Sequence, residues 1–295
     1  MKNHWLYWQR LLLFVLTLSI IQSSYAQGRR HKIPPIAVET MCQSIDVGGH
    51  QLFMLKAGQG NPVVVLIHGF ASTHCTFNGL VNVLSKDHTV ISYDRTGYGK
   101  STLGEASTDG LSQAAALAVV LDSLDIKRCV VVGHSFGCHI ARLFAHSFPD
   151  RTAGIVLLDP AHENTRRSMG EILKGEDLAL FKQMDGAMPP MQGGAGADQA
   201  QRETTFSALR QMAVLAPMPS VVISAGKRPV PREFSEAAQA RLIKNDWAMQ
   251  QDLARRVSAG VLIRLENAGH QVHLDAPEAV MAGLESVLEK VVSGR

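Results

Sequence analysis

Gly133, Ser135 and Gly137 form the pattern Gly-His-Ser-Phe-Gly, in which a hydroxyl nucleophile stands between two residues that lack side chains. The apolar run Cys129–Val132 before it predicts a buried strand, and the segment 138–148 after it has helical spacing. A tight turn must therefore join a strand to a helix at Ser135. In such a turn, the nucleophile elbow, the serine oxygen is lifted clear of the backbone and can attack a carbonyl carbon. An ordinary glycine-flanked turn would contain the same residues, so the rest of the chain must decide.

A serine hydroxyl is a weak nucleophile unless a base removes its proton, so the elbow predicts a histidine that a carboxylate orients. His270 meets this need near the end of the chain, because it follows a predicted strand and Gly269 before it suits a tight, exposed loop. His273 is the competing residue. Asp275 and Glu278 indicate the N-cap and capping box of a helix that begins directly afterwards. We therefore predict that His270 is the base.

The elements that must position these residues alternate along the chain. Apolar, strand-like runs recur, and amphipathic helical stretches such as 111–124 separate the later ones. This order predicts an α/β fold with a doubly wound, mostly parallel eight-stranded sheet, helices on both faces, and a site at the carboxyl ends of the strands. The eight runs are 43–49, 50–58, 62–70, 88–94, 128–135, 154–160, 220–226 and 259–267.

One connection, from about 161 to 220, is unusually long. Helical segments at 171–184 and 202–216 flank a stretch rich in proline and glycine, which predicts a small helical cap inserted after the sixth strand. Its methionines either line an adaptable apolar pocket or only fill space between helices. They are Met184, Met188, Met191 and Met212.

Four segments together resemble the cap-bearing branch of the α/β-hydrolase superfamily, from about Val38 to the C-terminus. They are Leu66–Phe70, Tyr93–Ser101, Gly133–Gly137 and Ala268–Glu278. Their common order and spacing make the resemblance far more specific than any one of them. It implies the fold, a catalytic triad of serine, acid and histidine, and no cofactor. We assign residues 27–295, which follow the predicted signal peptide, to this α/β-hydrolase domain.

The resemblance also implies an oxyanion hole. Its donors would be the backbone N–H groups of Phe70, which ends the third strand segment, and of Phe136, directly after the nucleophile. Other residues of the motifs are expected to support the loops around the site. These are His68, Gly69, Asp94, Arg95, Gly133 and Gly137.

The position of the acid departs from the commoner pattern. Many members of the superfamily have an aspartate after the seventh strand, where this chain has Lys227 and Arg228, which we assign to the solvated surface. Asp159 ends the sixth predicted strand in a segment similar to that of the pancreatic-type lipases. Because Ser135 and Asp159 would end adjacent parallel strands, Asp159 is the predicted acid. The alternative is that Asp159 only caps a turn, while the acid is Glu233, Glu236 or Asp246.

A serine at the elbow excludes the mechanism of epoxide hydrolases and haloalkane dehalogenases, which needs a carboxylate nucleophile. Acyl transfer remains, and hydrolysis of a small-molecule ester with a small or medium acyl chain is the leading function. Amide hydrolysis, as in proline-releasing aminopeptidases, would need acidic cap residues to bind an amino terminus. C–C bond hydrolysis, perhydrolysis and a non-catalytic ligand-binding role also stay open. The candidate acidic residues are Glu171, Glu176, Asp177 and Asp185.

The first 26 residues have the layout of a secretory signal peptide. Lys2 and Arg10 precede the apolar run Leu11–Ile21, and Ala26 stands at a suitable cleavage position. We therefore expect export to the periplasm or the medium, with no stable membrane span after cleavage. The basic segment 28–32 leaves an uncleaved membrane anchor as the lesser alternative.

Composition excludes several other classes. Removal of residues 1–26 takes away two basic and no acidic residues, so the formal net charge falls from +3 to +1, and a nearly neutral domain has no electrostatic footprint for nucleic acid. The cysteines have neither a disulfide framework nor metal-ligand spacing, and Cys129 and Cys138 are predicted to be buried thiols. The histidines lack the spacing of a zinc site, so no metal is expected. His162 and Glu163 are expected in a surface loop, and nothing in the sequence indicates the oligomeric state.

Overall fold

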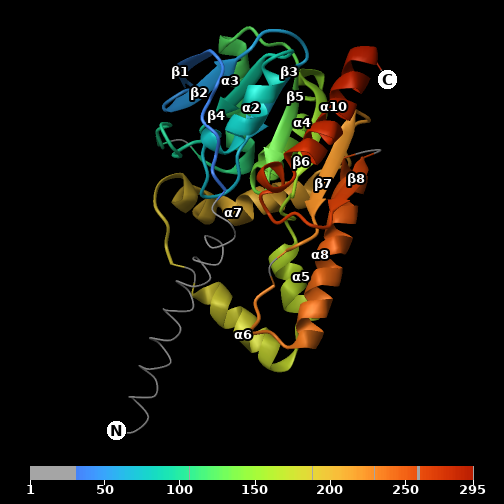
Figure 1. The fold of residues 1–295 in the computed structure, drawn as a ribbon. Helices are drawn as coiled ribbons and strands as arrows, with labels where there is room; N and C mark the ends of the chain where they lie inside the picture. Colours follow the sequence, from blue (N-terminus) through green and yellow to red (C-terminus); the bar gives the residue numbers. More distant parts are fainter. Residues whose placement is uncertain (1–30, 106, 188, 229, 258–259, 295) are drawn as a thin grey trace. The chain divides into compact units, whose positions relative to one another are not determined.

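The computed structural model describes residues 31–294, apart from residues 106, 188, 229, 258 and 259. The predicted signal peptide, residues 1–26, lies outside the described residues. The chain from Pro35 onward forms one compact unit (Figure 1). Within the described part of the chain, every helix is too short or too polar to span a bilayer.

One eight-stranded sheet forms the centre of this unit, in the order β1-β2-β4-β3-β5-β6-β7-β8. β2 pairs antiparallel with β1 and β4, and all other pairs are parallel. The mostly parallel, eight-stranded sheet predicted from the apolar runs is therefore confirmed. The strands are β1 (Thr40–Asp46), β2 (Gln51–Ala57), β3 (Val63–Ile67), β4 (Val90–Tyr93), β5 (Cys129–His134), β6 (Thr152–Leu158), β7 (Ser220–Ala225) and β8 (Val261–Leu265).

Helices surround the sheet and fill the long connection after β6. The α-helices are α2 (Asn78–Leu84), α3 (Gly110–Ser123), α4 (Gly137–Ser147), α5 (Thr165–Ile172), α6 (Gly175–Gly186), α7 (Gly193–Gln211), α8 (Glu236–Arg256), α9 (Val272–Asp275) and α10 (Pro277–Ser293). Two 3-10 turns are η1 (His74–Phe77) and η2 (Pro149–Arg151).

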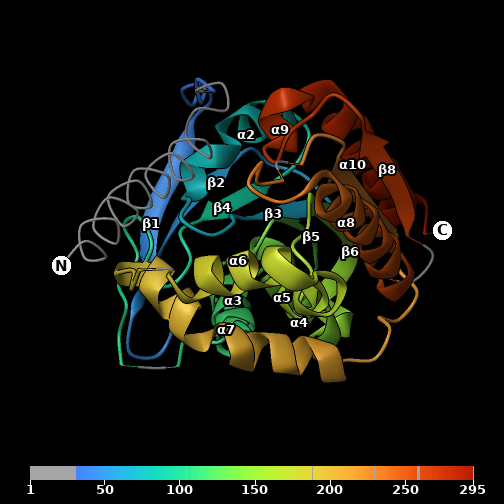
Figure 2. The ribbon, with the colours of Figure 1, turned by 90° about the horizontal axis from the view of Figure 1, so that it is seen from below.

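Successive residues of the central strands enter two different apolar clusters, because side chains alternate across a sheet. Val65 and Val131 pack with α3 and α4. Val64 and Val130 pack with α2 and α10 on the other face. Figure 2 shows these helix pairs on opposite sides of the sheet. The prediction of a doubly wound fold with helices on both faces is thus confirmed.

The helices α5, α6 and α7 are inserted between β6 and β7, as predicted for the cap. α5 and α6 pack with the first part of α8 around Leu173 and Phe234, and Met184 contacts this cluster. α7 lies against α3 and α4 instead, and Met212 after it is buried in their core. Met184 and Met212 therefore fill space between helices, whereas Met188 lies outside the described residues.

Candidate active site

Ser135 lies in the turn between β5 and α4 with a φ of +53°. This left-handed conformation is costly for a residue with a Cβ atom. The glycines on either side of the turn allow the neighbouring backbone to pack closely against it. A Cβ on Gly133 would lie 2.7 Å from the Cα of Cys138, and one on Gly137 would lie 2.2 Å from the carbonyl oxygen of Ile67. The pattern thus has the strand, strained turn and helix of a nucleophile elbow.

The Gly137→Ala variant is expected to lose about 1–3 kcal/mol of unfolding free energy, because its methyl group would meet the backbone of β3. Gly170→Ala in α5 is the matched control, since a Cβ there meets nothing within 4 Å. That variant should be neutral or more stable by up to about 1 kcal/mol. Urea unfolding measures both, and equal stabilities would contradict the close packing of the elbow on β3.

Three side chains meet at the elbow. Ser135 Oγ lies 2.9 Å from His270 Nε2, and His270 Nδ1 lies 2.6 Å from Asp159 Oδ2. A carboxylate only accepts, so Nδ1 carries the proton and Nε2 accepts from the serine. Ser135 and Asp159 follow the parallel neighbours β5 and β6, while His270 is in the loop after β8. The competing His273 is buried and contacts Thr76 Oγ1 at 3.1 Å instead.

Two hydrogen bonds position the loop that carries His270. His134 Nε2 donates to the carbonyl oxygen of His270 at 2.9 Å. Burial, with His270 as a second cause, lowers the pKa of His134 to about 3 and so keeps its ring neutral. The N–H of Gly269 donates to Asp275 Oδ2 at 2.7 Å. The predicted capping box was therefore wrong: Asp275 braces this loop, and no side chain caps α10.

Asp159 is completely buried, and all its polar contacts favour the carboxylate form. Its Oδ1 accepts from the backbone N–H of Ala225 at 2.9 Å and from Arg228 Nη2 at 2.5 Å. Burial opposes ionisation, but the hydrogen bond from His270 and the charge of Arg228 outweigh it and lower the pKa of Asp159. Asp159 is therefore present as the charged acceptor that His270 needs.

Arg228 corrects one expectation, because its side chain is only 24% exposed and does not belong to the solvated surface. Its Nη1 donates to Asp246 Oδ1 at 2.7 Å while Nη2 binds Asp159. Asp246, one of the alternative acids, thus reaches the site only through Arg228. Burial raises the pKa of Asp246, and the negative charge of Asp159 acts in the same direction, while the charge of Arg228 opposes both. The segment after β7, where the acid was expected from the commoner pattern, therefore carries the cation Arg228, which binds Asp159 after β6.

The two segments that carry the predicted oxyanion donors adjoin Ser135, one in sequence and one in space. Phe136 directly follows Ser135, and Phe70 follows Gly69, on which a Cβ would lie 3.1 Å from Ser135 Cβ. The rings of Phe70 and Phe136 have their centroids 6.4 Å apart. The Gly69–Phe70 segment and the turn that contains Ser135 and Phe136 are therefore neighbours in space.

Hydrogen bonds from His68 and Arg95 support the loop that carries Phe70. The backbone N–H of Arg95 donates to His68 Nε2 at 3.0 Å, so the ring proton is on Nδ1, which donates to the Gly69 oxygen at 2.8 Å. Burial, followed by the charge of Arg95, lowers the pKa of His68 and keeps this ring neutral. The Arg95 guanidinium also donates to the carbonyl oxygens of His68 and Gly69, at 3.0 and 3.1 Å.

Sequence reasoning misplaced two residues after β6. His162 and Glu163 were expected in a surface loop, yet they are 5% and 2% exposed. Glu163 Oε2 accepts from Arg142 Nη1 at 2.7 Å, and both side chains are fully buried. Although burial opposes it, the contact with Arg142 lowers the pKa of Glu163. The available signal was Arg142 on the apolar helix after the elbow, since a buried charge needs an opposite charge beside it.

The family model for the alpha/beta hydrolase family matches residues 64–283, most of the chain. The chain belongs to the alpha/beta hydrolase family. The resemblance on the four sequence segments is therefore confirmed. A relative, Uncharacterized protein Rv2715 of Mycobacterium tuberculosis, is 35% identical over 112 residues, 38% of this chain. The match spans 33% of that relative's length.

Solved structures share the fold of this alpha/beta hydrolase. A thermophilic esterase from Thermogutta terrifontis has 20% identity and a TM-score of 0.61, with 84% of this chain and 99% of that chain covered. The epoxide hydrolase CorEH has 16% identity and a TM-score of 0.60, with 86% and 100% covered. At such identities, the similarity shows a common architecture.

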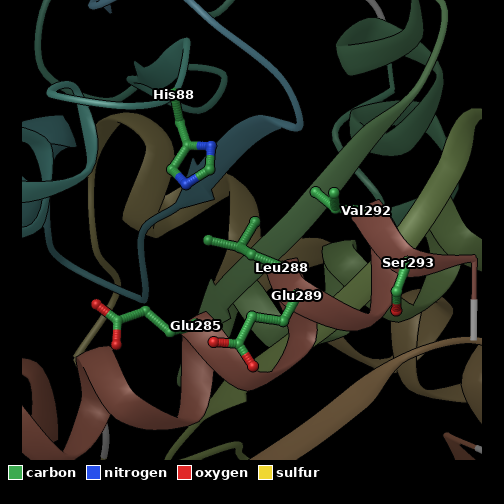
Figure 3. A pocket seen from close by; sticks show the side chains of 6 residues that line it. All are labelled: His88, Glu285, Leu288, Glu289, Val292 and Ser293. Carbon is green, nitrogen blue, oxygen red and sulfur yellow. The ribbon is translucent and has the colours of Figure 1, made fainter.

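A pocket of about 320 Å³ in this hydrolase is lined by His88 and by residues of α10 (Figure 3). His88 lies just before the amino end of β4, whereas Ser135 directly follows the carboxyl end of β5. The pocket is therefore separate from the residues gathered at Ser135. It is lined by His88, Glu285, Leu288, Glu289, Val292 and Ser293.

Proposed function

We propose that this chain is a serine hydrolase that cleaves carboxylic esters of small or medium acyl chain through an acyl-enzyme on Ser135. The supporting observation is the continuous hydrogen bonding of Ser135, His270 and Asp159 at a strained elbow. These contacts supply a nucleophile, a base and the group that orients the base. An esterase among proteins of similar fold agrees with this function.

Acylation follows from the positions of the protons. Ser135 Oγ attacks the ester carbonyl while its proton passes to His270 Nε2, which lies 2.9 Å away. Asp159, ionised and 2.6 Å from Nδ1, stabilises the imidazolium that forms. The N–H groups of Phe70 and Phe136 bind the negative oxygen of the tetrahedral intermediate. His270 then gives its proton to the alcohol oxygen, the C–O bond breaks, and the acyl group remains on Ser135.

Deacylation uses the same groups in reverse. A water molecule attacks the acyl carbon and transfers a proton to His270 Nε2, and the oxyanion forms again beside Phe70 and Phe136. Collapse of this intermediate breaks the bond to Ser135 Oγ, which takes the proton back from His270. The carboxylic acid leaves, and the triad returns to its starting protonation state.

Amide hydrolysis at a free amino terminus is less well supported by the acidic residues of the inserted segment. Glu171 pairs with Arg167 at 3.2 Å, and Asp185 pairs with Arg166. Asp177 accepts from the hydroxyl of Ser235 at 2.7 Å. Three of the four candidate carboxylates are thus already engaged. Carboxylates paired in this way are less available to bind a substrate ammonium group.

The test is hydrolysis of p-nitrophenyl esters of graded acyl length, with amino-acid p-nitroanilides measured in parallel. We expect turnover of the esters, greatest for short or medium chains, and stoichiometric labelling of Ser135 by a fluorophosphonate. Turnover of the anilides alone would support a peptidase. Folded protein that is neither labelled nor active on any ester would refute the proposed function.

Arg228→Gln is expected to shift the acid limb of the kcat/KM profile for esters to higher pH. Arg228 lowers the pKa of Asp159, so its removal raises that pKa and protonates the carboxylate at a less acidic pH. The loss of activity should therefore grow as the pH falls. Lys227→Gln, a change of equal charge one residue earlier, is the control. Identical pH profiles for the two variants would show that Arg228 does not tune the triad.

A further inference from the structure

Arg95 lies behind the predicted oxyanion loop with a fully occupied guanidinium group. It is 1% exposed and comes directly after the β4 strand and Asp94. Nε donates to the carbonyl oxygen of His68, and Nη2 donates to that of Gly69. Nη1 donates to Gln113 Oε1 at 2.8 Å, and the two remaining N–H groups reach Asp198. All five guanidinium donors are thus used, two of them on the loop that carries Phe70.

The carboxylate that neutralises Arg95 comes from the inserted segment. Asp198 is in α7 and is 2% exposed, and its oxygens lie 3.0 and 2.7 Å from Arg95 Nη1 and Nη2. Tyr98 Oη donates to Asp198 Oδ2 at 2.7 Å, and Gln113 Nε2 donates to Oδ1 at 3.1 Å. This bidentate geometry fixes both the distance and the orientation of the guanidinium.

The first turn of α7 packs directly against the loop after β4. The N–H of Gly194 donates to the carbonyl oxygen of Gly97 at 2.8 Å. The ring of Tyr98 lies so close that a Cβ on Gly194 would be 2.2 Å from its Cδ2. The Arg95 guanidinium also lies over the ring of Phe136, 5.2 Å from its centroid. Asp198, Arg95 and both segments of the predicted oxyanion hole therefore form one packed group.

We propose that Asp198 is a positioning residue for the oxyanion hole: through Arg95, the inserted helix α7 holds the His68–Gly69 segment where the Phe70 N–H can bind the oxyanion. The inference rests on the proposed serine hydrolase function. A buried guanidinium without its carboxylate would move toward water or other acceptors, and the carbonyl oxygens of His68 and Gly69 would lose their donors. Since a misplacement of about 1 Å at a reacting centre costs about 100-fold in rate, the effect should appear in catalysis.

Asp198→Asn tests the proposal, because it keeps the shape of the side chain and removes its charge. We expect kcat for a p-nitrophenyl ester to fall about 10- to 100-fold, while KM changes less than about threefold. Affinity for a trifluoromethyl ketone, whose adduct carries the oxyanion, should fall in parallel with kcat. Glu203→Gln is the matched control on α7, because Glu203 is 80% exposed and contacts only Arg210 among the ion pairs found in the described residues. It should keep the wild-type kcat.

A double variant, Arg95→Met with Asp198→Leu, separates positioning from folding. The double variant leaves no buried charge unpaired, so it should unfold at a higher temperature than Arg95→Met alone. It nevertheless lacks the donors to His68 and Gly69, and its kcat should stay low. If Asp198→Asn yields no folded protein, the double variant decides the question.

Two results would overturn the inference while leaving the function in place. One is a wild-type kcat in folded Asp198→Asn, and the other is a wild-type kcat in the double variant. A wild-type chain that neither hydrolyses esters nor reacts with a fluorophosphonate would instead refute the proposed function, and this inference with it.

Discussion

If the proposed mechanism holds, Ser135→Ala is expected to reduce kcat for p-nitrophenyl ester hydrolysis by about 10⁶-fold, the loss typical of a serine protease without its nucleophile. The hydroxyl 2.9 Å from His270 Nε2 is the group that forms the acyl-enzyme in the proposed mechanism. Without it, His270 has no serine proton to remove, and only background hydrolysis aided by binding remains. Steady-state kinetics with the best ester of the graded series would measure the loss.

The same variant should remain folded. Alanine has a Cβ like serine, so the strain at a φ of +53° does not change, and the loss of one hydrogen bond costs about 1 kcal/mol. Thermal unfolding checks this point, and fluorophosphonate labelling should disappear. Substantial ester turnover by folded Ser135→Ala would place the nucleophile elsewhere in the chain.

Asp159→Asn is expected to lower kcat by about 10⁴-fold. The amide keeps the size of the carboxylate, but it neither stabilises an imidazolium nor reliably holds the Nδ1–H tautomer of His270. Because Asp159 Oδ2 lies 2.6 Å from Nδ1, the exchange acts directly on the base. The measurement is kcat at a pH well above the acid limb, so that protonation of the wild-type triad does not mask the difference.

Asp246→Asn is the comparison that assigns the acid. Asp246 binds Arg228 Nη1 at 2.7 Å and reaches Asp159 only through that guanidinium. Its replacement should lower kcat by less than about tenfold, an effect typical of a residue that does not contact the base. If the Asp246 variant lost as much activity as expected for Asp159, and the Asp159 variant did not, the acid would have been misassigned.

Much of the site could be predicted because its residues stand at the ends of strands. The apolar runs mark β5 and β6, and in a parallel sheet their carboxyl ends are neighbours, so Ser135 and Asp159 had to come close together. His270 could be placed by the glycine before it and the strand before that. These inferences need only local patterns and the regular spacing of a sheet.

The charged partners of the site could not be predicted in this way. Arg228 binds a carboxylate 69 residues away, and Arg95 binds Asp198 at a separation of 103 residues. Their local sequences are those of polar loops and helix surfaces, so the burial of these side chains arises from contacts between distant segments that the local sequence does not show. Asp275 is a different case: the sequence pattern indicates a helix N-cap, but its Oδ2 accepts the backbone N–H of Gly269, six residues earlier, and Ala276 is the N-cap of α10.

Ser135 and Asp159 come before the inserted helices in the chain, and this order matters when the insertion is exchanged for that of another protein. Ser135 and Asp159 both precede the inserted helices, which run from Thr165 to Gln211, and hydrogen-bonded neighbouring strands set their spacing. A chimaera that takes its inserted helices from another family member would therefore keep Ser135 and Asp159 and the spacing between them. Such a graft has to satisfy the guanidinium of Arg95, which Asp198 of the native insertion neutralises. A compatible insertion would then have to supply a buried negative charge at the position of Asp198.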